Sequence, residues 1–454
     1  MDFVPNTDQD RQLMLRTVGV ESLDELIQVI PAQVRYPKLD LPGPLTEMEL
    51  LAELRSMAEE NADAEHFSYF LGAGSYHHHV PSAVSQLLLR SELYTAYTPY
   101  QPEISQGTLQ AAFEFQSMIC SLMGMEVSNA SMYDGATAMA EAALMAVAAT
   151  KRDKVVVSGR VHPQYRSVLD SYMRSRGVKV VASSVGCRDG MVVEDDLAAL
   201  LDSDSACCIV QQPDFLGGVR DLSELAERTH GVGALFIISA DPISLGMLKS
   251  PGEWGADIAV GEGQGLGAPM SYGGPYLGLL ATRERLVRLM PGRLVGEAYD
   301  HRGRRGFVLT LQAREQHIRR EKATSNICTS EQLLATGAAI YLALLGPGGL
   351  RQVAKLCYDK AHHAASRIAS VDGYQIVDAG PFFNEFVVHC PLPPAEVNQL
   401  LLEDKIVGGY DLSGFGPGFE DCMLLCATET NTATQIDALV GALAKAAATT
   451  GGTR

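Results

Sequence analysis

The sequence predicts an α/β fold in which one large, mostly parallel sheet domain is followed by a smaller α+β domain. Between residues 109 and 281, short apolar strand-like runs alternate with helical segments, which indicates crossover connections between parallel strands with helices on both faces. From about Glu331 the pattern changes to helices with a few separate strands. A chain of 454 residues, 46% hydrophobic and 20% charged, is able to bury a sizeable core.

The individual elements follow from runs of apolar residues and from the Gly- and Pro-containing breaks between them. In the large domain we expect strands at 154–157, 178–182, 208–211, 235–240, 258–260 and 276–281. We expect helices at 109–125, from about 134 to 149, and at 165–176, 195–201 and 222–229. In the small domain we expect strands near 374–377, 386–389 and 423–426 and a last helix after Asn431.

We divide the chain into an N-terminal arm with interface loops (1–108), a large α/β domain (109–330) and a small C-terminal α+β domain (331–454). In the first sixty residues, helical patches at 23–29 and 48–60 are separated by prolines, so we expect an arm that wraps a larger body or a partner. Residues 67–106 are rich in Gly, Tyr, His and Pro, and they predict ordered irregular loops because disordered segments are poor in aromatic residues.

Composition excludes several classes of function. A net charge of −18 argues against a nucleic-acid groove and against binding to anionic membranes. Cys207 and Cys208 are adjacent, and Cys422 and Cys426 are too far apart for a C-x-x-C motif, so we interpret most of the cysteines as small buried residues. We see neither a signal peptide nor an apolar run of membrane-spanning length, and we therefore expect a cytoplasmic chain with reduced thiols.

Three segments suggest a ligand site, because ligands of doubly wound sheets bind beyond the carboxyl ends of the strands. Asp134–Thr137 opens a helix whose free N–H groups suit a phosphate, although, taken alone, the segment is better explained by Asp134 as the helix N-cap. His162 follows the strand at 154–157, and Asp241 follows the strand at 235–240. In an enzyme that uses pyridoxal phosphate (PLP), such a histidine can stack on the pyridine ring and such an aspartate can pair with the ring nitrogen.

The glycine-rich segment Ala256–Gly278 resembles the strand and turn that carry the cofactor lysine in PLP enzymes of fold type I. This segment contains no lysine. Part of it, Gly263–Ala268, matches a G-x-G-x-x-A string, but prolines and glycines follow where a dinucleotide-binding motif needs a helix. The turn therefore disfavours NAD.

Two further motifs have competing interpretations. His77, His78 and His79 suggest zinc, but consecutive side chains point in different directions and no matching Cys or Glu spacing is present. We expect no metal site and a role in a substrate loop. The segment Arg319–Thr329 is either part of a site or a solvated helix end capped by Thr329 or Ser330.

Four segments together resemble the P-protein family of the glycine cleavage system, namely Phe70–Pro81, Tyr97–Gly107, Gly261–Pro275 and Arg320–Thr329. The resemblance covers nearly the whole chain and is closest to the N-terminal half of the family, which many bacteria encode as a separate subunit 1. It implies glycine decarboxylation with PLP, transfer of the aminomethyl group to the lipoyl arm of H-protein, and α2β2 assembly with a homologous subunit that holds PLP.

The resemblance also implies roles for individual residues. Aligning Gly274–Pro275 with the lysine turn of the catalytic half places Gln264 at the lysine position, and an amide cannot form a Schiff base. PLP would then be absent from a vestigial pocket comprising Gly135, Ala136, Thr137, His162, Asp241 and Gln264. Residues expected to act in the partner's active site are His78, His79, Tyr97, Tyr100 and Glu103 as catalytic groups and Ser105, Gln106, Thr324, Ser325 and Asn326 near the cofactor.

Two alternatives remain at this stage. The chain could be a stand-alone PLP enzyme that uses another lysine, such as Lys249 or Lys322. It could also be a non-catalytic scaffold that stabilises a partner. Borohydride trapping of PLP on the chain would indicate the first alternative. Unchanged turnover after substitution of the Tyr97–Gln106 loop would indicate the second.

Overall fold

A computed structural model describes residues 6–323, 325–378 and 380–450. The chain forms two compact units, Met1–Asn61 and Ala62–Arg454. The first unit holds the helices α1 (Asp8–Val18), α2 (Leu23–Leu26) and α3 (Glu47–Ala58) and a 3₁₀ turn, η1 (Ala32–Val34). None of the residues in these helices is buried, and leucines and methionines of α1 and α3 are exposed. The boundaries expected at residues 108 and 330 stay predictions.

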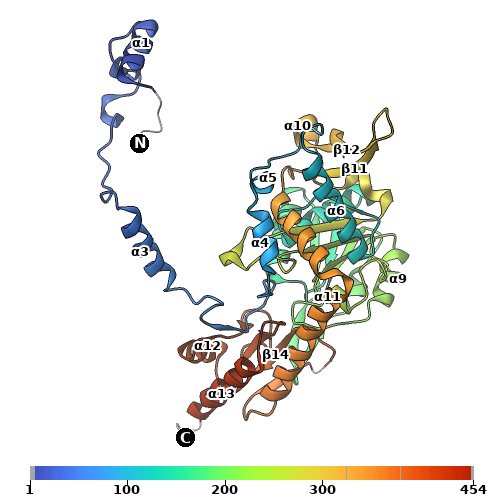
Figure 1. The fold of residues 1–454 in the computed structure, drawn as a ribbon. Helices are drawn as coiled ribbons and strands as arrows, with labels where there is room; N and C mark the ends of the chain where they lie inside the picture. The colour runs from blue at the N-terminus through green and yellow to red at the C-terminus, as the bar shows by residue number, and fades with distance from the viewer. Residues whose placement is uncertain (1–5, 324, 379, 451–454) are drawn as a thin grey trace. The chain divides into compact units, whose positions relative to one another are not determined.

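The centre of the second unit is a seven-stranded sheet (Figure 1) with the order β2-β10-β9-β8-β7-β3-β4. Its strands are β2 (Val127–Ser128), β3 (Lys154–Val157), β4 (Lys179–Ala182), β7 (Ser205–Gln212), β8 (Leu235–Ala240), β9 (Ile258–Glu262) and β10 (Gly278–Thr282). The five strands from β4 to β9 run parallel, whereas β10 and β2 pair antiparallel. The predicted mostly parallel sheet is therefore confirmed.

Helices cover both faces of this sheet. Alternate strand residues such as Val155 and Ile237 pack with α7 (Gly135–Thr150) and α8 (Pro163–Ser175). The intervening residues pack on the other face with α9 (Ser223–Gly231), α6 (Gln106–Met123) and the first half of α11 (Gln332–Ile368). Burial on both faces explains why the strands read as continuous apolar runs. The helix expected at 195–201 is instead a short 3₁₀ turn, η2 (Leu197–Leu200).

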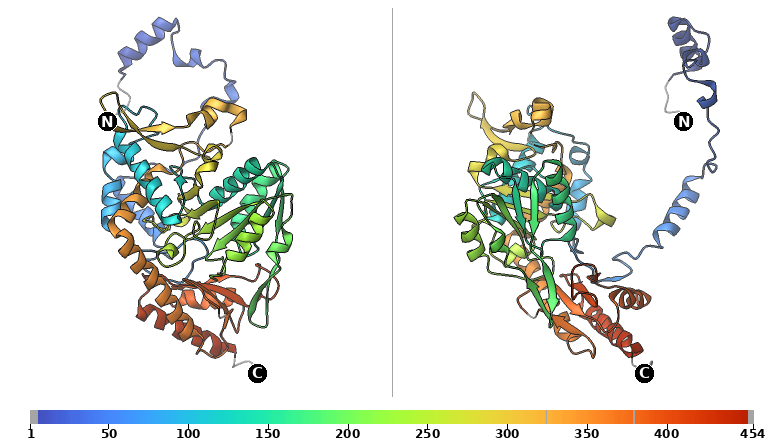
Figure 2. Two further views of the ribbon diagram at one scale, coloured as in Figure 1. Left: turned by 90° about the vertical axis from the view of Figure 1, so that its right-hand side faces the viewer. Right: turned by 180° about the vertical axis from the view of Figure 1, so that it is seen from behind.

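The C-terminal part contains a four-stranded antiparallel sheet with the order β13-β14-β17-β16. Its elements are β13 (Gln375–Val377), β14 (Glu385–His389), α12 (Pro394–Glu403), β16 (Tyr410–Asp411), β17 (Cys422–Cys426) and α13 (Ala433–Thr450). The views in Figure 2 place this sheet and its helices at one end of the second unit and the yellow hairpin β11–β12 (Leu294–Tyr299 and Arg305–Thr310) at the other. A separate hydrophobic core joins this sheet to α12, α13 and the last turns of α11.

Helix α11 is, among the described residues, the one helix that is long and apolar enough to cross a membrane, although we expected no such run. Its backbone leaves helical geometry at Gly346, just before Pro347. On one side of this break Ala335 and Tyr341 belong to the core of the large sheet, and on the other side Ala361 belongs to the C-terminal core. We therefore interpret α11 as a core helix that connects the two sheets.

Several elements were not expected from the sequence. The hairpins β5–β6 (Val185–Arg188 and Met191–Glu194) and β11–β12, and the short strand pair β1–β15 (Ser68–Tyr69 and Ile406–Val407), have no counterpart among the predicted strands. Residues 67–106, expected to be irregular throughout, contain α4 (Ser82–Leu88) and α5 (Ser91–Tyr94). The loop prediction was wrong for these two helices.

Candidate functional site

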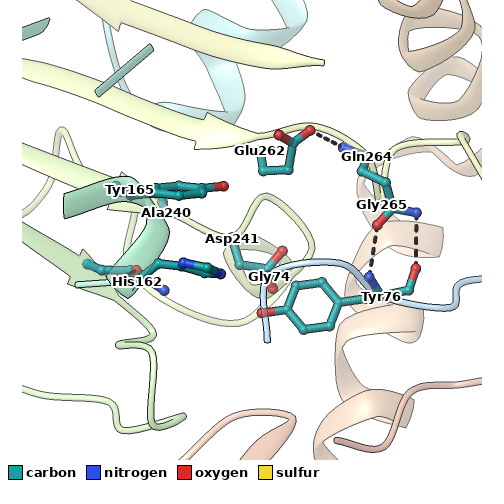
Figure 3. A pocket seen from close by; sticks show the side chains of 11 residues that line it. Gly74, Tyr76, His162, Tyr165, Ala240, Asp241, Glu262, Gln264 and Gly265 are labelled. Carbon is teal, nitrogen blue, oxygen red and sulfur yellow. Dashed lines mark hydrogen bonds between the residues drawn. The ribbon is translucent and has the colours of Figure 1, made fainter. Parts of the chain in front are cut away.

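A small cavity lies at the carboxyl ends of β7, β8 and β9, where the topology of the sheet predicts a ligand site. Its volume is about 30 Å³. Figure 3 shows its lining, to which the predicted pocket residues His162, Asp241 and Gln264 contribute together with Tyr76 and Glu262. The other predicted pocket residues, Gly135, Ala136 and Thr137, form the first turn of α7.

Gln264 occupies the expected lysine position, and its side chain is hydrogen-bonded to the backbone of the loop that contains Tyr76, beside the cavity. Its side-chain Oε1 accepts a hydrogen bond from the backbone N–H of Tyr76 at 2.9 Å. Its Nε2 donates to the carbonyl oxygen of Tyr76 at 3.0 Å (Figure 3) and to that of Ala268 at 2.8 Å. Gln264 is 1% exposed, so these bonds form away from water. The amide therefore holds the segment 74–76 across the opening.

Glu262 places a carboxylate at the N-terminus of α7, where the sequence suggested a phosphate site. Its Oε2 accepts from the Gly135 N–H at 2.9 Å, and its Oε1 accepts from the N–H groups of Gln264 and Leu277, both at 3.0 Å. Burial raises the pKa of Glu262 to about 7, against the lowering effect of these hydrogen bonds. Asp134 caps the same helix by accepting from the Thr137 N–H at 2.7 Å. Protein groups thus already satisfy this anion-binding turn.

Aromatic rings fill the space beside His162. The imidazole stacks on the ring of Tyr165, with 4.8 Å between centroids and 23° between planes. His162 Nε2 lies 2.8 Å from the carbonyl oxygen of Ala73, and burial lowers the pKa of this histidine. Asp241 accepts hydrogen bonds from the N–H groups of Ile243 and Ser244, both at 3.2 Å, and burial raises its pKa. Both predicted cofactor ligands therefore have partners within the chain.

PLP does not fit this cavity. A volume of about 30 Å³ admits only a few water molecules, whereas sites for cofactors measure roughly 300–1,000 Å³. The two lysines considered from the sequence do not line the cavity. Lys249 lies with its Nζ 4.5 Å from the centre of the Trp254 ring, and Lys322 is exposed. The stand-alone PLP enzyme therefore has no anchoring lysine in the described part of this pocket.

A second site surrounds Arg293, at the start of β11. The guanidinium donates from Nη1 to Thr98 Oγ1 at 3.2 Å and from Nη2 to the Tyr100 hydroxyl at 3.0 Å. It also lies 5.1 Å from the centre of the Tyr100 ring. Thr98 Oγ1 is in turn 3.2 Å from Thr329 Oγ1. The predicted loop Tyr97–Gln106 and the end of the predicted segment Arg320–Thr329 are therefore in contact.

Comparisons with known proteins decide the family. The model of the family "Glycine cleavage system P-protein" matches residues 1–443. A protein of Thermomicrobium roseum named probable glycine dehydrogenase (decarboxylating) subunit 1 is 55% identical, covering 99% of this chain and 100% of that protein. A protein of the same name from Desulforamulus reducens is 50% identical, covering 98% and 99%.

The chain belongs to the glycine cleavage system P-protein family.

Solved structures agree with this assignment and confirm the predicted fold class. A crystal structure of glycine decarboxylase (P-protein) of the glycine cleavage system, in inhibitor-bound form, superposes with a TM-score of 0.90 at 47% identity, covering 98% of this chain and 100% of the other. The sphingosine-1-phosphate lyase of Burkholderia pseudomallei superposes with a TM-score of 0.64 at 14% identity, covering 92% and 94%. This second likeness shows the fold alone.

In this P-protein chain the two predicted histidines differ in burial: His78 is in the core and His79 is at the surface. His78 is buried, and its Nδ1 lies 2.7 Å from Oε2 of Glu429. Burial would raise the pKa of Glu429, but the hydrogen bond and charge of His78 outweigh it and hold that pKa at about 2. The Cys357 thiol donates to the same oxygen at 3.3 Å. One side-chain atom each of His78, Cys357 and Glu429, which are far apart in the sequence, thus lie within 4.8 Å of one another. His79 presents an exposed side chain.

The other predicted active-site residues of this P-protein chain differ in exposure and in their partners. Tyr97 is 75% exposed, and Glu103 and Asn326 are exposed as well. The side-chain amide of Gln106 is hydrogen-bonded to β12: its Oε1 accepts from the Phe307 N–H and its Nε2 donates to the Phe307 carbonyl oxygen, both at 2.9 Å. Ser105 precedes α6 without a side-chain capping bond.

The segment before α11 also departs from one of its sequence interpretations. Ser325 donates to Oε1 of Glu141 in α7 at 3.1 Å, and Thr324 lies outside the described residues. The capping interpretation of Thr329 and Ser330 was wrong: α11 begins at Gln332, its N-cap position is Glu331, and no side chain caps it.

Sequence reasoning missed Glu262, Tyr165 and Arg293. Glu262 directly follows a buried apolar strand, which is the one local signal that could have drawn attention to it. Tyr165 and Arg293 become informative only through contacts with residues far away in the sequence.

Proposed function

We propose that this chain is subunit 1 of a glycine dehydrogenase (decarboxylating) and acts in a complex with a homologous subunit that holds PLP. The observation that carries the proposal is the self-filled pocket. The fold of a PLP enzyme is retained, yet Gln264 stands at the aligned lysine position, Glu262 accepts from the N-terminus of α7, and Tyr165 stacks on His162. The name "subunit 1" of the relatives at 55% and 50% identity supports the existence of a second subunit.

The complex would decarboxylate glycine and pass the aminomethyl group to lipoylated H-protein. PLP in the partner's pocket supplies an electron sink for the carbon–carbon bond that breaks. This chain would contribute exposed polar groups from the two contacting loops, among them Tyr97 and Glu103. We propose that Ser105, Thr324, Ser325 and Asn326 lie near the partner's cofactor and that His79 lies at the same site.

Tyr100 is the residue of these loops for which the structure suggests a chemical role. Burial raises the pKa of its phenol, and the neighbouring charge of Arg293 opposes that shift. The phenol therefore stays protonated at neutral pH. It can donate a hydrogen bond to bound glycine, or it can donate its proton to a reacting group as a general acid. With its ring held by Arg293, Tyr100 would orient the substrate and exclude water from one side of it.

The assembly we propose is a cytoplasmic α2β2 heterotetramer. The first unit of the chain supports such an assembly, because its three short helices form no core of their own within that unit. The interface between the two kinds of subunit should then exceed the ~1,600 Å² of a standard complex.

The test compares this chain alone with the chain co-expressed with a homologous subunit that carries a lysine in the equivalent turn. We expect no PLP absorption band and no glycine–CO2 exchange from the chain alone, and both from the complex. After borohydride reduction the cofactor should be attached to the second subunit. Cofactor trapped on this chain would contradict the proposal.

The scaffold alternative predicts the same cofactor placement but a different response to substitution. If this chain only stabilised its partner, changes at Tyr97, Tyr100 and Glu103 would leave exchange by the assembled complex unaltered. The buried cation beneath the two loops favours an active role, because a passive interface needs no such group.

A further inference from the structure

We propose that Arg293 is the positioning residue that holds the loops 97–106 and 325–329 of this chain in the geometry required for turnover. The inference rests on the proposed function, since it concerns the contribution of these loops to the partner's active site. Arg293 itself is 4% exposed and lies beneath the loop surface, so it acts through the residues it holds.

The contacts of Arg293 connect the two loops directly. On the first loop the guanidinium bonds Thr98 and Tyr100, whose oxygen atoms lie 3.2 and 3.0 Å away. On the second loop its Nη2 lies 3.4 Å from Cys328 Sγ. One planar group with several fixed donors thus sets the distance between both loops and the face that the Tyr100 ring presents.

The charge of Arg293 is compensated from the opposite side. Its Nε lies 3.8 Å from Oε2 of Glu315, which is also buried. His317 lies 3.5 Å from the same carboxylate oxygen and contacts the Tyr100 ring edge-on at 5.9 Å. A buried ion pair is often no more stabilising than apolar residues of the same size, so its presence beneath these loops favours a role in specifying their geometry.

The backbone of Arg293 is fixed to the large domain. Its carbonyl oxygen accepts from the Ala130 N–H at 2.8 Å, and the strand β11 begins at the next residue. A side chain mounted on a strand end transmits the position of the sheet to the loops more accurately than a second loop could. Beside it lies a cavity of about 190 Å³ lined by Tyr97, Thr98 and Thr329.

This cavity makes a chemical rescue experiment possible. In Arg293→Ala, we expect kcat for glycine–CO2 exchange by the assembled complex to fall on the order of 10²-fold, since a small misplacement of oriented groups can cost that much. Added guanidinium ion should enter the vacated site and restore at least about a tenth of the wild-type rate. Arg293→Lys should remain at least about tenfold impaired, because an ammonium cannot satisfy three acceptors held in a fork.

The matched control is Arg152→Ala, at the opposite, amino-terminal end of β3. Arg152 also bridges separate segments, donating to the carbonyl oxygens of Ser205 at 2.8 Å and Val232 at 2.9 Å. Guanidinium should not change exchange by this variant. The inference is overturned if Arg293→Ala turns over within about threefold of wild type, or if guanidinium gives no recovery.

A second measurement does not depend on the proposed function. Hydrogen exchange of the isolated chain should show that Arg293→Ala loses protection in both 97–106 and 325–329, while α7 keeps its protection. Unchanged protection of either loop overturns the inference. If the wild-type complex itself lacks glycine–CO2 exchange, the proposed function fails, and the hydrogen-exchange result alone decides the role of Arg293.

Discussion

At the scale of single residues, the chain uses ordinary side chains to close a pocket that its fold would otherwise leave open. Gln264 forms three hydrogen bonds with backbone groups of its own chain, and Glu262 accepts three more. Under the proposed function, Gln264 stands at the position of the lysine, and Glu262 takes the helix N-terminus that would bind the phosphate of the cofactor. Reversing one of them leaves the others in place.

We therefore expect Gln264→Lys to remain without PLP. The new amine would reach a cavity of about 30 Å³, and the Glu262 carboxylate would still occupy the N-terminus of α7. The measurement is the absorption spectrum of the purified variant with excess PLP, followed by borohydride reduction and mass analysis of the Gly261–Pro275 peptide. A reduced adduct on residue 264 would show that the pocket can open.

The loop residues give a second test at this scale. Tyr100→Phe keeps the ring and removes the hydroxyl, and Glu103→Gln keeps the shape and removes the charge. We expect at least one variant to lower glycine–CO2 exchange by about 10²-fold or more, which is the usual effect of losing a positioned proton donor or acceptor. Tyr358→Phe on α11 is the control: it removes a tyrosine hydroxyl outside the loops and should leave glycine–CO2 exchange unchanged. If both loop variants assemble normally and exchange at the wild-type rate, the loop is structural.

At the scale of elements, tight packing fixes the first turn of α7. A Cβ atom added at Gly135 would lie 2.6 Å from the Tyr165 hydroxyl and 3.1 Å from Glu262 Cβ. The glycine therefore permits the close approach that brings Glu262 to the helix end.

We expect Gly135→Ala to lower the free energy of unfolding by about 1–3 kcal/mol, as is typical of overpacking. The matched substitution Gly441→Ala in α13 meets no atom within 4 Å and should stabilise the chain by roughly 0.5–1 kcal/mol through helix propensity. Urea unfolding of both variants measures the difference. Equal effects of the two substitutions would mean that the α7 turn is not tightly packed.

The sequence was most informative where local composition decides structure. Strands 154–157 and 235–240 have the predicted bounds because each is a short apolar run buried on both faces. The hairpin β11–β12 was missed because glycine and charged residues interrupt its apolar residues, so that neither strand forms a continuous apolar run. A single sequence holds no local signal for the buried guanidinium of Arg293, because its partners come from loops about 195 and 35 residues away.

At the scale of the whole molecule, buried carboxyl groups give stability an unusual dependence on pH. Burial raises the pKa of Glu141, Glu262 and Glu385 to about 7. Each group binds its proton more tightly in the folded chain than in the unfolded chain, so its stabilising contribution is complete below about pH 4.5 and is lost as the pH rises through 7. Glu429 acts in the opposite sense: its pKa is lowered to about 2, so its stabilising contribution is complete above about pH 4.5 and is lost as the pH falls through 2.

We therefore expect the free energy of unfolding of the isolated chain to decrease from pH 5 to pH 8. Each pKa unit corresponds to about 1.4 kcal/mol, so one such group contributes at most about 3 kcal/mol over this range. Glu141→Gln should make the dependence shallower. Urea midpoints of the wild type and of Glu141→Gln at pH 5, 6, 7 and 8 test this, and an identical pH dependence of the two proteins would contradict the raised pKa of Glu141.

The filled pocket also has a consequence for the supply of this chain in a cell. A ligand stabilises a fold only when it binds to it, and an enzyme that needs its coenzyme to reach full stability is lost when the corresponding vitamin is scarce. Here Glu262, Tyr165 and Gln264 are synthesised with the chain and fill the space themselves. Vitamin B6 starvation should therefore leave the amount of this chain unchanged, so that a reserve is ready to assemble as soon as loaded partner molecules reappear.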